Sequence, residues 1–231
     1  MPGVLYLVAT PIGNYGDITF RALETLKGAD LIICEERREG ETLLRHFGIE
    51  KPLETLNEHN EAAAAQVILG HLSQGKSVAL VSDSGTPVFS DPGQILVRTA
   101  AERGVRIVPV PGASSLLPAL TVSGFSIDRF LFYGWLSPKK DRRRAELRQL
   151  LQERRTIVLM DTPYRLIPLL RDLSEAFGAS RRMCLALDLT TPGEQILYGT
   201  APELHAAAST RNLKGEFVIV IEGRVLDQKT R

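Results

Sequence analysis

Cysteine is scarce in this chain of 231 residues, and its two copies, Cys34 and Cys184, lie far apart in apolar stretches. This placement argues against a disulfide scaffold and against a metal site built from cysteine pairs. We therefore expect two reduced thiols packed in the core, and we expect no bound metal.

Long apolar runs and an excess of charge are also absent. No stretch reaches the roughly 18 consecutive apolar residues that a membrane span needs, and no basic region precedes an apolar segment at the amino terminus. We therefore expect a cytoplasmic protein. The formal net charge is only +1, so binding of nucleic acid has to depend on a local basic patch. The Gly-rich dinucleotide fingerprint and the Gly-Lys-Ser/Thr phosphate loop are missing, which disfavours NAD and ATP.

Short β-branched runs alternate with helical patterns along the first half of the chain, which is typical of a parallel sheet built from βαβ units. The predicted strands are residues 5–9, 31–34, 78–82 and 105–110. The predicted helices are residues 20–27, 41–47, 60–75 and 93–104. These elements predict one open parallel sheet.

The second half repeats this alternation after a helix at residues 114–122 and a polar junction at residues 126–129. Its predicted helices are residues 141–153 and 164–177, and its predicted strands are residues 130–133, 156–160, 183–189, 194–199 and 217–222. The last two strands fit antiparallel pairing as well as parallel pairing, so we expect a mixed sheet. The sequence therefore predicts an α/β protein with domains at residues 1–124 and 125–231 and a frayed tail after Glu222.

Three loops rich in Pro, Gly and small polar residues follow predicted strands of the first domain, at residues 10–14, 82–87 and 111–115. Each loop alone is more typical of an ordinary turn. Ligands of open α/β sheets bind beyond the carboxyl ends of the strands, where such loops let them approach the backbone. Three of them at one edge favour a shared ligand site.

The same loops belong to longer motifs, which are LYLVATPIGNYGDITFRALETL at residues 5–26, EHNE at 58–61, ALVSDSGTPVFSDPG at 79–93, VPVPGASS at 108–115 and GEFVIVIEG at 215–223. Together and in this order they resemble the ribosomal RNA small subunit methyltransferase I family, of the tetrapyrrole methylase fold class (class III S-adenosylmethionine methyltransferases). The resemblance implies a homodimer of two-domain subunits that bind S-adenosylmethionine between the domains and release S-adenosylhomocysteine. It implies methylation of the ribose 2′-hydroxyl of a cytidine in 16S rRNA, with the RNA or the 30S subunit as partner.

The resemblance also implies which residues contact the cofactor. In the first domain they are Pro11, Asp83, Ser84, Gly85, Thr86, Pro87, Val88, Ser114 and Ser115. In the second domain they are Asp161, Thr162, Leu187 and Gly215.

A ribose hydroxyl is a weak acid, so a nearby carboxylate or cation would assist the loss of its proton. The candidate catalytic residues are therefore charged residues at positions that match the family. They are Glu35, Glu36, Arg38, His59 and Glu194. Each has a plainer interpretation: a solvated helix start for Glu35 to Arg38, a capping residue for His59 and a surface strand residue for Glu194. Asp83 has one too, because its side chain can hold its own loop.

Residues 139–155 contain eight basic and three acidic residues, which makes this segment the predicted RNA-binding patch. The residues expected to bind RNA are Lys139, Lys140, Arg142, Arg143 and Arg144. A helix with a solvated charged face would look similar. Just upstream, Tyr133 and Trp135 fit either stacking on a base or core packing.

Three features depart from the family pattern. Tyr164 stands where the family has histidine, and Leu187-Asp188 stands where it has Arg-Glu. The chain also ends near residue 231, where the family continues into a small helical extension. These changes keep two alternatives open: a related methyltransferase acting on a tetrapyrrole or another small molecule, and a module that binds S-adenosylmethionine or RNA without turnover.

Overall fold

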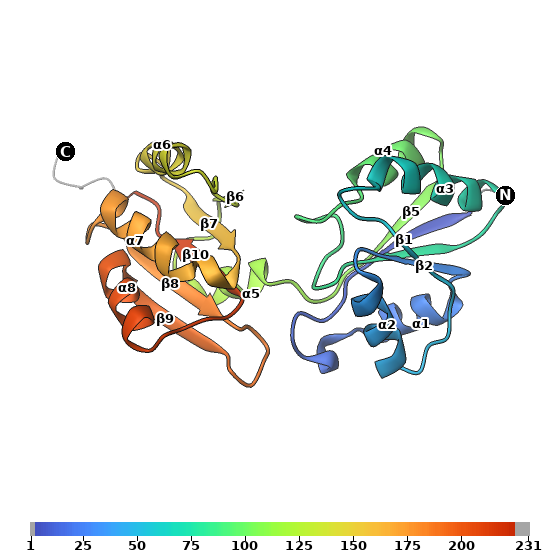
Figure 1. Cartoon of the computed structure of the whole chain (residues 1–231), viewed down its shortest axis with the longest axis horizontal. Coiled ribbons are helices and arrows are strands. Elements are labelled where there is room, and N and C mark those ends of the chain that lie inside the picture. Colours follow the sequence, from blue (N-terminus) through green and yellow to red (C-terminus); the bar gives the residue numbers. More distant parts are fainter. Residues whose placement is uncertain (1–2, 225–231) are drawn as a thin grey trace. The chain divides into compact units, whose positions relative to one another are not determined.

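The computed structural model describes residues 3–224. Most of the predicted tail after Glu222 therefore lies outside the described residues. The chain forms two compact units, Met1–Ser114 and Ser115–Arg231 (Figure 1). The boundary precedes helix α5 (Leu116–Ser123), whereas the sequence placed it after this helix. The reason is that α5 contacts strands β8 (Arg182–Leu187) and β10 (Phe217–Ile221) of the second unit.

The first unit contains a five-stranded sheet in the order β3-β2-β4-β1-β5. All of its strand pairs are parallel, as the sequence predicted. Val8 at the end of β1 lies beside both Val81 at the end of β4 and Val110 at the end of β5, so the carboxyl ends of these strands meet at one edge. The strands are β1 (Val4–Val8), β2 (Leu31–Cys34), β3 (Leu53–Thr55), β4 (Val78–Val81) and β5 (Arg106–Val110).

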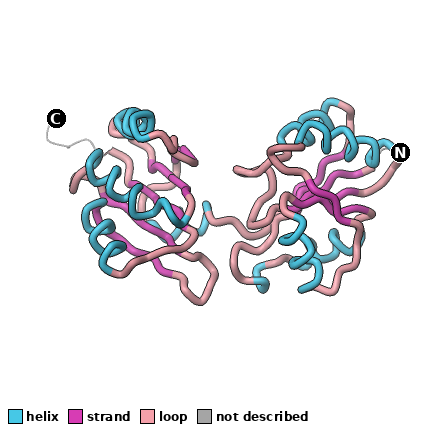
Figure 2. The backbone as a smooth tube through the Cα atoms, in the orientation of Figure 1, coloured by secondary structure: helices cyan, strands magenta, loops and turns pink. Residues whose placement is uncertain are grey.

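Helices cover both faces of this sheet (Figures 1 and 2). Helices α1 (Phe20–Gly28) and α2 (Arg37–His46) lie on one face, and α3 (Glu61–Ser73) and α4 (Gln94–Glu102) lie on the other. The central strands are therefore apolar on both sides: Ile32 packs with α1 and α2, and its neighbour Ile33 packs with α3.

The loops after β1 and β4 diverge from the middle of the sheet. The chain leaves β1 toward β2 and leaves β4 toward β5, which lie on opposite sides of this strand pair. Such a topological switch point is where open α/β sheets form ligand crevices. Thr10 joins the two loops: its N–H donates to Gly85 O at 2.9 Å, the N–H of Gly85 donates back at 3.2 Å, and the Thr10 hydroxyl donates to Ser82 O at 2.9 Å.

The second unit contains a mixed sheet in the order β6-β7-β10-β8-β9, which confirms the predicted sheet type. Only β6 and β7 run parallel. Helices α6 (Lys140–Leu150), α7 (Leu166–Phe177) and α8 (Ala201–Thr210) contribute to the core. The remaining strands are β6 (Phe130–Gly134), β7 (Thr156–Asp161) and β9 (Gln195–Thr200).

Three elements differ from the sequence prediction. Helix α2 begins at Arg37, four residues before its predicted start at residue 41, and strand β3 and helix α8 were not predicted. Helix α8 had a readable signal, because Thr200 and Glu203 form a capping box and Pro202 lies in its first turn. Within residues 3–224, no helix is long and apolar enough to cross a membrane.

We predict that Thr10→Val lowers the free energy of unfolding by about 1–3 kcal/mol, because it leaves the buried Ser82 carbonyl without its hydroxyl donor. The matched control is Thr25→Val, which removes a 2.7 Å hydroxyl bond to Arg21 O on the exposed surface of α1. Urea unfolding followed by circular dichroism measures both variants. Equal losses of unfolding free energy in the two variants would show that the buried link between the loops stabilises the protein no more than an exposed hydroxyl bond does.

Candidate active site

Acidic side chains gather at the carboxyl edge of the first sheet. They follow three neighbouring strands: Glu35 and Glu36 after β2, Glu58 after β3, and Asp83 and Asp91 after β4. Burial raises the pKa of the half-buried Glu35 carboxyl to about 7, and the charges of the other four carboxylates add to the shift. A carboxyl group with this pKa is about half ionised near neutral pH and can accept a proton there.

Hydrogen bonds fix two of these carboxylates in place. The Ser82 hydroxyl donates to Asp91 Oδ2 at 2.5 Å, and the Glu36 N–H donates to Asp83 Oδ1 at 3.3 Å. Burial nevertheless raises the pKa of both aspartates. Asp83 therefore bonds to the loop after β2, in addition to any role within its own loop. Among the described residues, no cluster of His, Cys, Asp and Glu is arranged to hold a metal ion.

The loop after β4 has an unusual backbone. Val88 and Ser90 have φ values of 70° and 68°, in the left-handed region that β-branched and other non-glycine residues rarely occupy. Such a conformation costs about 1–3 kcal/mol per residue and persists only where the surroundings impose it. Backbone strain of this kind clusters at ligand sites, and Val88 is one of the residues predicted to contact the cofactor.

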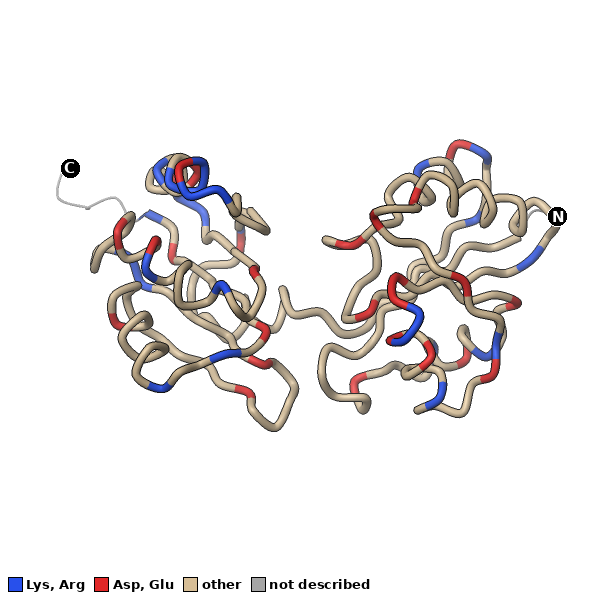
Figure 3. The backbone as a smooth tube through the Cα atoms, viewed as in Figure 1, with Lys and Arg blue, Asp and Glu red and all other residues tan. Residues whose placement is uncertain are grey.

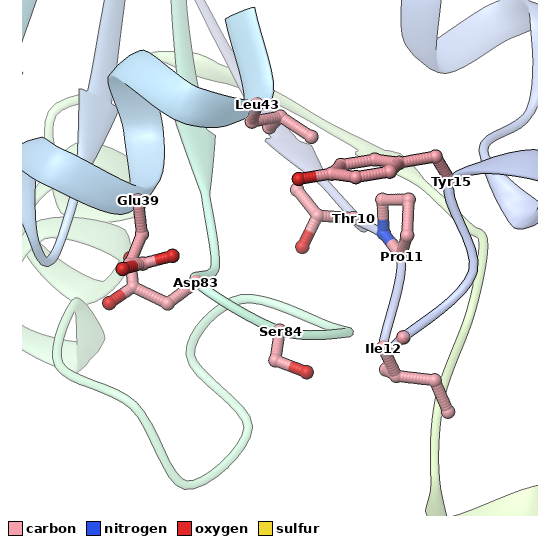
Figure 4. Close-up of a pocket in the computed structure, with 9 residues that line it drawn as sticks. Thr10, Pro11, Ile12, Tyr15, Glu39, Leu43, Asp83 and Ser84 are labelled. Atoms are coloured by element: carbon pink, nitrogen blue, oxygen red, sulfur yellow. The ribbon is translucent and has the colours of Figure 1, made fainter. Parts of the chain in front are cut away.

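A pocket of about 260 Å³ opens between the loops after β1 and β4 and helix α2 (Figure 4). The ring of Tyr15 forms one wall and stacks on His46, with ring centres 3.8 Å apart and planes 15° apart. The carboxylates of Glu39 and Asp83 lie together at another side of the pocket (Figure 4). The pocket is lined by Thr10, Pro11, Ile12, Gly13, Tyr15, Glu39, Leu43, Asp83 and Ser84.

The three predicted ligand loops meet at Gly85, which has a φ of 87°. A Cβ atom there would lie 3.1 Å from Ile12 Cγ2 in the loop after β1 and 3.7 Å from Ala113 O in the loop after β5. The structure thus brings together the three loops that carry the predicted cofactor residues of the first domain. Ser114 closes the loop after β5, and Ser115 begins the second unit.

The catalytic candidates are not all in one place. Glu35 and Glu36 lie in the acidic cluster, whereas Arg38 is exposed on α2 and does not line the pocket. His59 is almost fully exposed on the loop before α3, with Nε2 3.5 Å from Glu58 Oε1. Glu194 belongs to the second unit, where its carboxylate accepts the Thr190 N–H at 2.7 Å. Asp91 was not a candidate, because nothing in its spacing reveals the bond to Ser82.

The four predicted cofactor residues of the second unit lie at one edge of its sheet. Phe217 at the start of β10 pairs with Asp161 on one side and with Leu187 on the other. The buried Asp161 uses only Oδ1, which accepts the Thr162 N–H at 2.8 Å and lies 3.2 Å from Arg165 Nη1. Burial raises its pKa, and these two donors oppose the shift.

Three buried polar atoms at this edge have no hydrogen-bond partner among the described residues: Asp161 Oδ2, Thr162 Oγ1 and Thr190 Oγ1. Unsatisfied buried polar atoms are costly, so these three need a partner from outside the described chain, either water or a ligand group. At the same edge, a Cβ atom on Gly215 would collide with the Asp188 carboxylate, which would have to shift. Sequence reasoning missed Thr190, which has a φ of 69°.

Basic and acidic residues alternate along α6 (Figure 3), and the predicted RNA-binding residues fall into two groups by their ion pairs. Arg143 is 12% exposed and forms a 2.6 Å ion pair with Asp172, and Arg144 pairs with Glu175 at 2.5 Å. The Arg142 side chain is 77% exposed, and its Nε lies 3.7 Å from Glu146 Oε1, which is a loose ion pair. Lys139 and Lys140 are exposed and form no salt bridge with any described residue. The first group therefore supports α6, and the second is available to a ligand.

Comparison with known proteins gives consistent matches. The family described as Tetrapyrrole (Corrin/Porphyrin) Methylases matches residues 4–205. The chain is 46% identical over 221 residues to a ribosomal RNA small subunit methyltransferase I of Synechocystis sp., covering 96% of this chain and 79% of that protein. It is 43% identical over 223 residues to the protein of the same name from Escherichia coli O157:H7, covering 96% and 78%.

Solved structures share the fold at lower sequence identity. A cobalt precorrin-4 methyltransferase aligns with a TM-score of 0.69 at 18% identity, covering 95% of this chain and 94% of that one. A uroporphyrin-III C-methyltransferase from Thermus thermophilus, complexed with S-adenosylhomocysteine, aligns with a TM-score of 0.65 at 18% identity, covering 95% and 97%. These likenesses confirm the predicted fold class.

We predict that Glu35→Gln raises the melting temperature at about pH 8 and leaves it unchanged at pH 4.5. The folded-state pKa of about 7 exceeds the ordinary 4.5, so the stability contributed by protonated Glu35 is complete below pH 4.5 and is lost as pH rises through 7. The substitution relieves the burial of the charge first and the repulsion by its neighbours second, and each kcal/mol relieved corresponds to about 2–4 °C in a chain of this size. Calorimetry measures the melting temperatures, with the exposed Glu24→Gln on α1 as control. A fall in stability at pH 8 would contradict the raised pKa of Glu35.

Proposed function

This chain belongs to the ribosomal RNA small subunit methyltransferase I family, and we propose that it transfers a methyl group from S-adenosylmethionine to the ribose 2′-hydroxyl of a cytidine in 16S rRNA. The observation that carries this proposal is the acidic cluster beside the pocket of the first unit. There Glu35, with a pKa near 7, is suited to accept the proton of a weakly acidic hydroxyl.

The residues of the second unit fit the cofactor. S-adenosylmethionine has an ammonium group, ribose hydroxyls and an exocyclic amine, all of which donate hydrogen bonds. Asp161 Oδ2 is a buried acceptor without a partner in the described chain, and the unpartnered hydroxyls of Thr162 and Thr190 lie at the same edge of the sheet. We propose that these groups hold the cofactor together with Leu187 and Gly215, and that Pro11, residues 83–88, Ser114 and Ser115 do so in the first unit.

The cofactor supplies an electrophilic methyl group carried on a sulfonium. The residues of this chain then have two tasks. One is alignment of the hydroxyl oxygen, for which effective molarities are worth up to about 7–11 kcal/mol. The other is removal of the hydroxyl proton, which we assign to the Glu35 carboxylate. The bonds from Ser82 to Asp91 and from Glu36 to Asp83 keep the surrounding carboxylates in position.

The pocket of the first unit favours a nucleoside over a tetrapyrrole as the group it receives. Its volume of about 260 Å³ lies below the roughly 300–1,000 Å³ typical of pockets for drug-sized ligands, and a tetrapyrrole macrocycle is a large ligand. Tyr15 offers an aromatic wall for a base, and carboxylates such as Glu39 and Asp83 accept hydrogen bonds from the exocyclic amine of cytosine.

We predict that the protein transfers a radiolabelled methyl group from S-adenosylmethionine to 30S subunits taken from cells that lack it. Nuclease mapping of the product should place the label on a ribose 2′-oxygen of a cytidine. Naked 16S rRNA in a parallel reaction tests whether the assembled subunit is needed, and sedimentation analysis tests the homodimer that we also propose. Tight cofactor binding by calorimetry without any label on RNA would overturn the proposed acceptor and support a small-molecule substrate.

The pH dependence of this reaction tests Glu35 separately. We expect kcat to rise with pH up to about 7 and then to level off, because only the ionised carboxylate accepts a proton. Glu35→Gln should lower kcat by roughly 10²- to 10⁴-fold and abolish the rise. Glu24→Gln should leave kcat and the profile unchanged. A Glu35→Gln enzyme that keeps the wild-type pH profile would remove Glu35 from the chemistry.

A further inference from the structure

We propose that Trp135 and Tyr164, flanked by Lys139, Lys140 and Arg142, form a platform on which unpaired bases of single-stranded RNA stack. This inference rests on the proposed function and adds to it a binding surface for unpaired bases. It concerns the second unit alone. We call these five residues the stacking platform.

The loops that carry the two aromatic residues follow neighbouring parallel strands. Trp135 directly follows β6, and Tyr164 lies in the short 3-10 helix (Pro163–Arg165) that follows β7. The end of β6 pairs with β7 through Gly134 and Leu159. Arg165 then joins the two loops, because its Nη2 donates to the carbonyls of Leu136 and Ser137, at 3.4 Å each.

Both rings are exposed although their neighbours are buried. Trp135 is 48% exposed and Tyr164 is 73% exposed, whereas the adjacent Leu136 and Leu166 are 2% and 0% exposed. In each loop a leucine fills the buried position, and the aromatic ring faces solvent instead. Aromatic rings with a free face stack on any base at about 1–3 kcal/mol per base, without sequence preference.

The loop that carries Trp135 is held rigidly. Arg143 Nη1 donates to the carbonyls of Ser137 and Pro138 at 3.0 and 2.9 Å, and Glu146 accepts the Ser137 N–H at 2.8 Å. Arg143 is itself fixed by its ion pair with Asp172. A preorganised loop loses little conformational entropy on binding, so Arg143 is a positioning residue for the platform.

The charges beside the rings complement a phosphate backbone. Lys139 and Lys140 are exposed at the start of α6, and Arg142 follows on the same exposed turn. The acidic residues nearby are Asp141, which is exposed, and Glu146, which faces Arg142 and the loop. Exposed cations on the segment that directly follows Trp135 suit single-stranded RNA, whose splayed bases stack while its phosphates pair with cations.

The test uses Trp135, the only tryptophan of the chain, as its own probe. The full-length protein is titrated with a short single-stranded oligocytidylate while tryptophan fluorescence is recorded. We expect saturable quenching that weakens with salt. Tyr164→Leu should weaken binding by roughly 5- to 150-fold, the affinity equivalent of one lost base stack, whereas Tyr164→His should retain most of it.

Controls separate stacking from charge and from folding. Phe20→Leu removes a ring that is 88% exposed in the first unit and should leave binding unchanged. The double variant Lys139→Ala/Lys140→Ala should weaken binding and reduce its salt dependence while quenching at saturation persists. Trp135→Leu, followed by anisotropy of labelled RNA, should weaken binding as Tyr164→Leu does, and Trp135→Phe should not. Circular dichroism verifies that each variant is folded.

The outcomes are distinct. Absence of quenching, or equal affinity for Tyr164→Leu and wild type, overturns the platform, and capture of a protein partner without RNA quenching does so too. If the wild type methylates 30S subunits but fails this test, the platform is wrong and the proposed function stands. If oligocytidylate quenches Trp135 as described but no methyl group reaches 16S rRNA, the platform stands and the proposed function fails.

Discussion

The link between the loops after β1 and β4 is the constraint on which the first site depends. These loops leave the sheet in opposite directions, and without a connection each would be free at the switch point. Thr10 connects them through two side-chain and two backbone hydrogen bonds. With the β4 loop held, Asp83 can accept the Glu36 N–H, so the loop after β2 is positioned as well. The acidic cluster is a consequence of this arrangement.

This cluster lowers stability at neutral pH. Burial raises the pKa of Glu35, Asp83 and Asp91, and repulsion from neighbouring carboxylates adds to the shift at Glu35 and Asp83. Each of these carboxylates therefore opposes folding when it ionises. Val88 and Ser90 add backbone strain in the same loop. A structure under no functional demand would have no reason to keep both costs in one place. Their coincidence beside the pocket is the physical argument for a working site.

Most of the fold could be predicted because its signals are local. Runs of β-branched residues separated by helical patterns revealed the parallel sheet, and small-residue loops marked its ligand edge. Strand β3 escaped because it has only three residues, all half-buried, and no apolar run marks it. The site was less predictable, because its contacts are distant in sequence. The bond from Ser82 to Asp91 spans a strained loop, and Arg143 pairs with Asp172 29 residues away.

That pair bears on the proposed binding of RNA by a chain whose formal net charge is only +1. In a sum of charges every arginine of residues 139–155 counts equally. In the structure these arginines differ in exposure and in their ion pairs. Arg143 and Arg144 are neutralised by α7 carboxylates and hold the loop and helix in place, which leaves Lys139, Lys140 and Arg142 as the exposed cations of the platform. Affinity for RNA would then depend on a few free cations and on stacking, so it would respond less steeply to salt than binding by the whole basic segment.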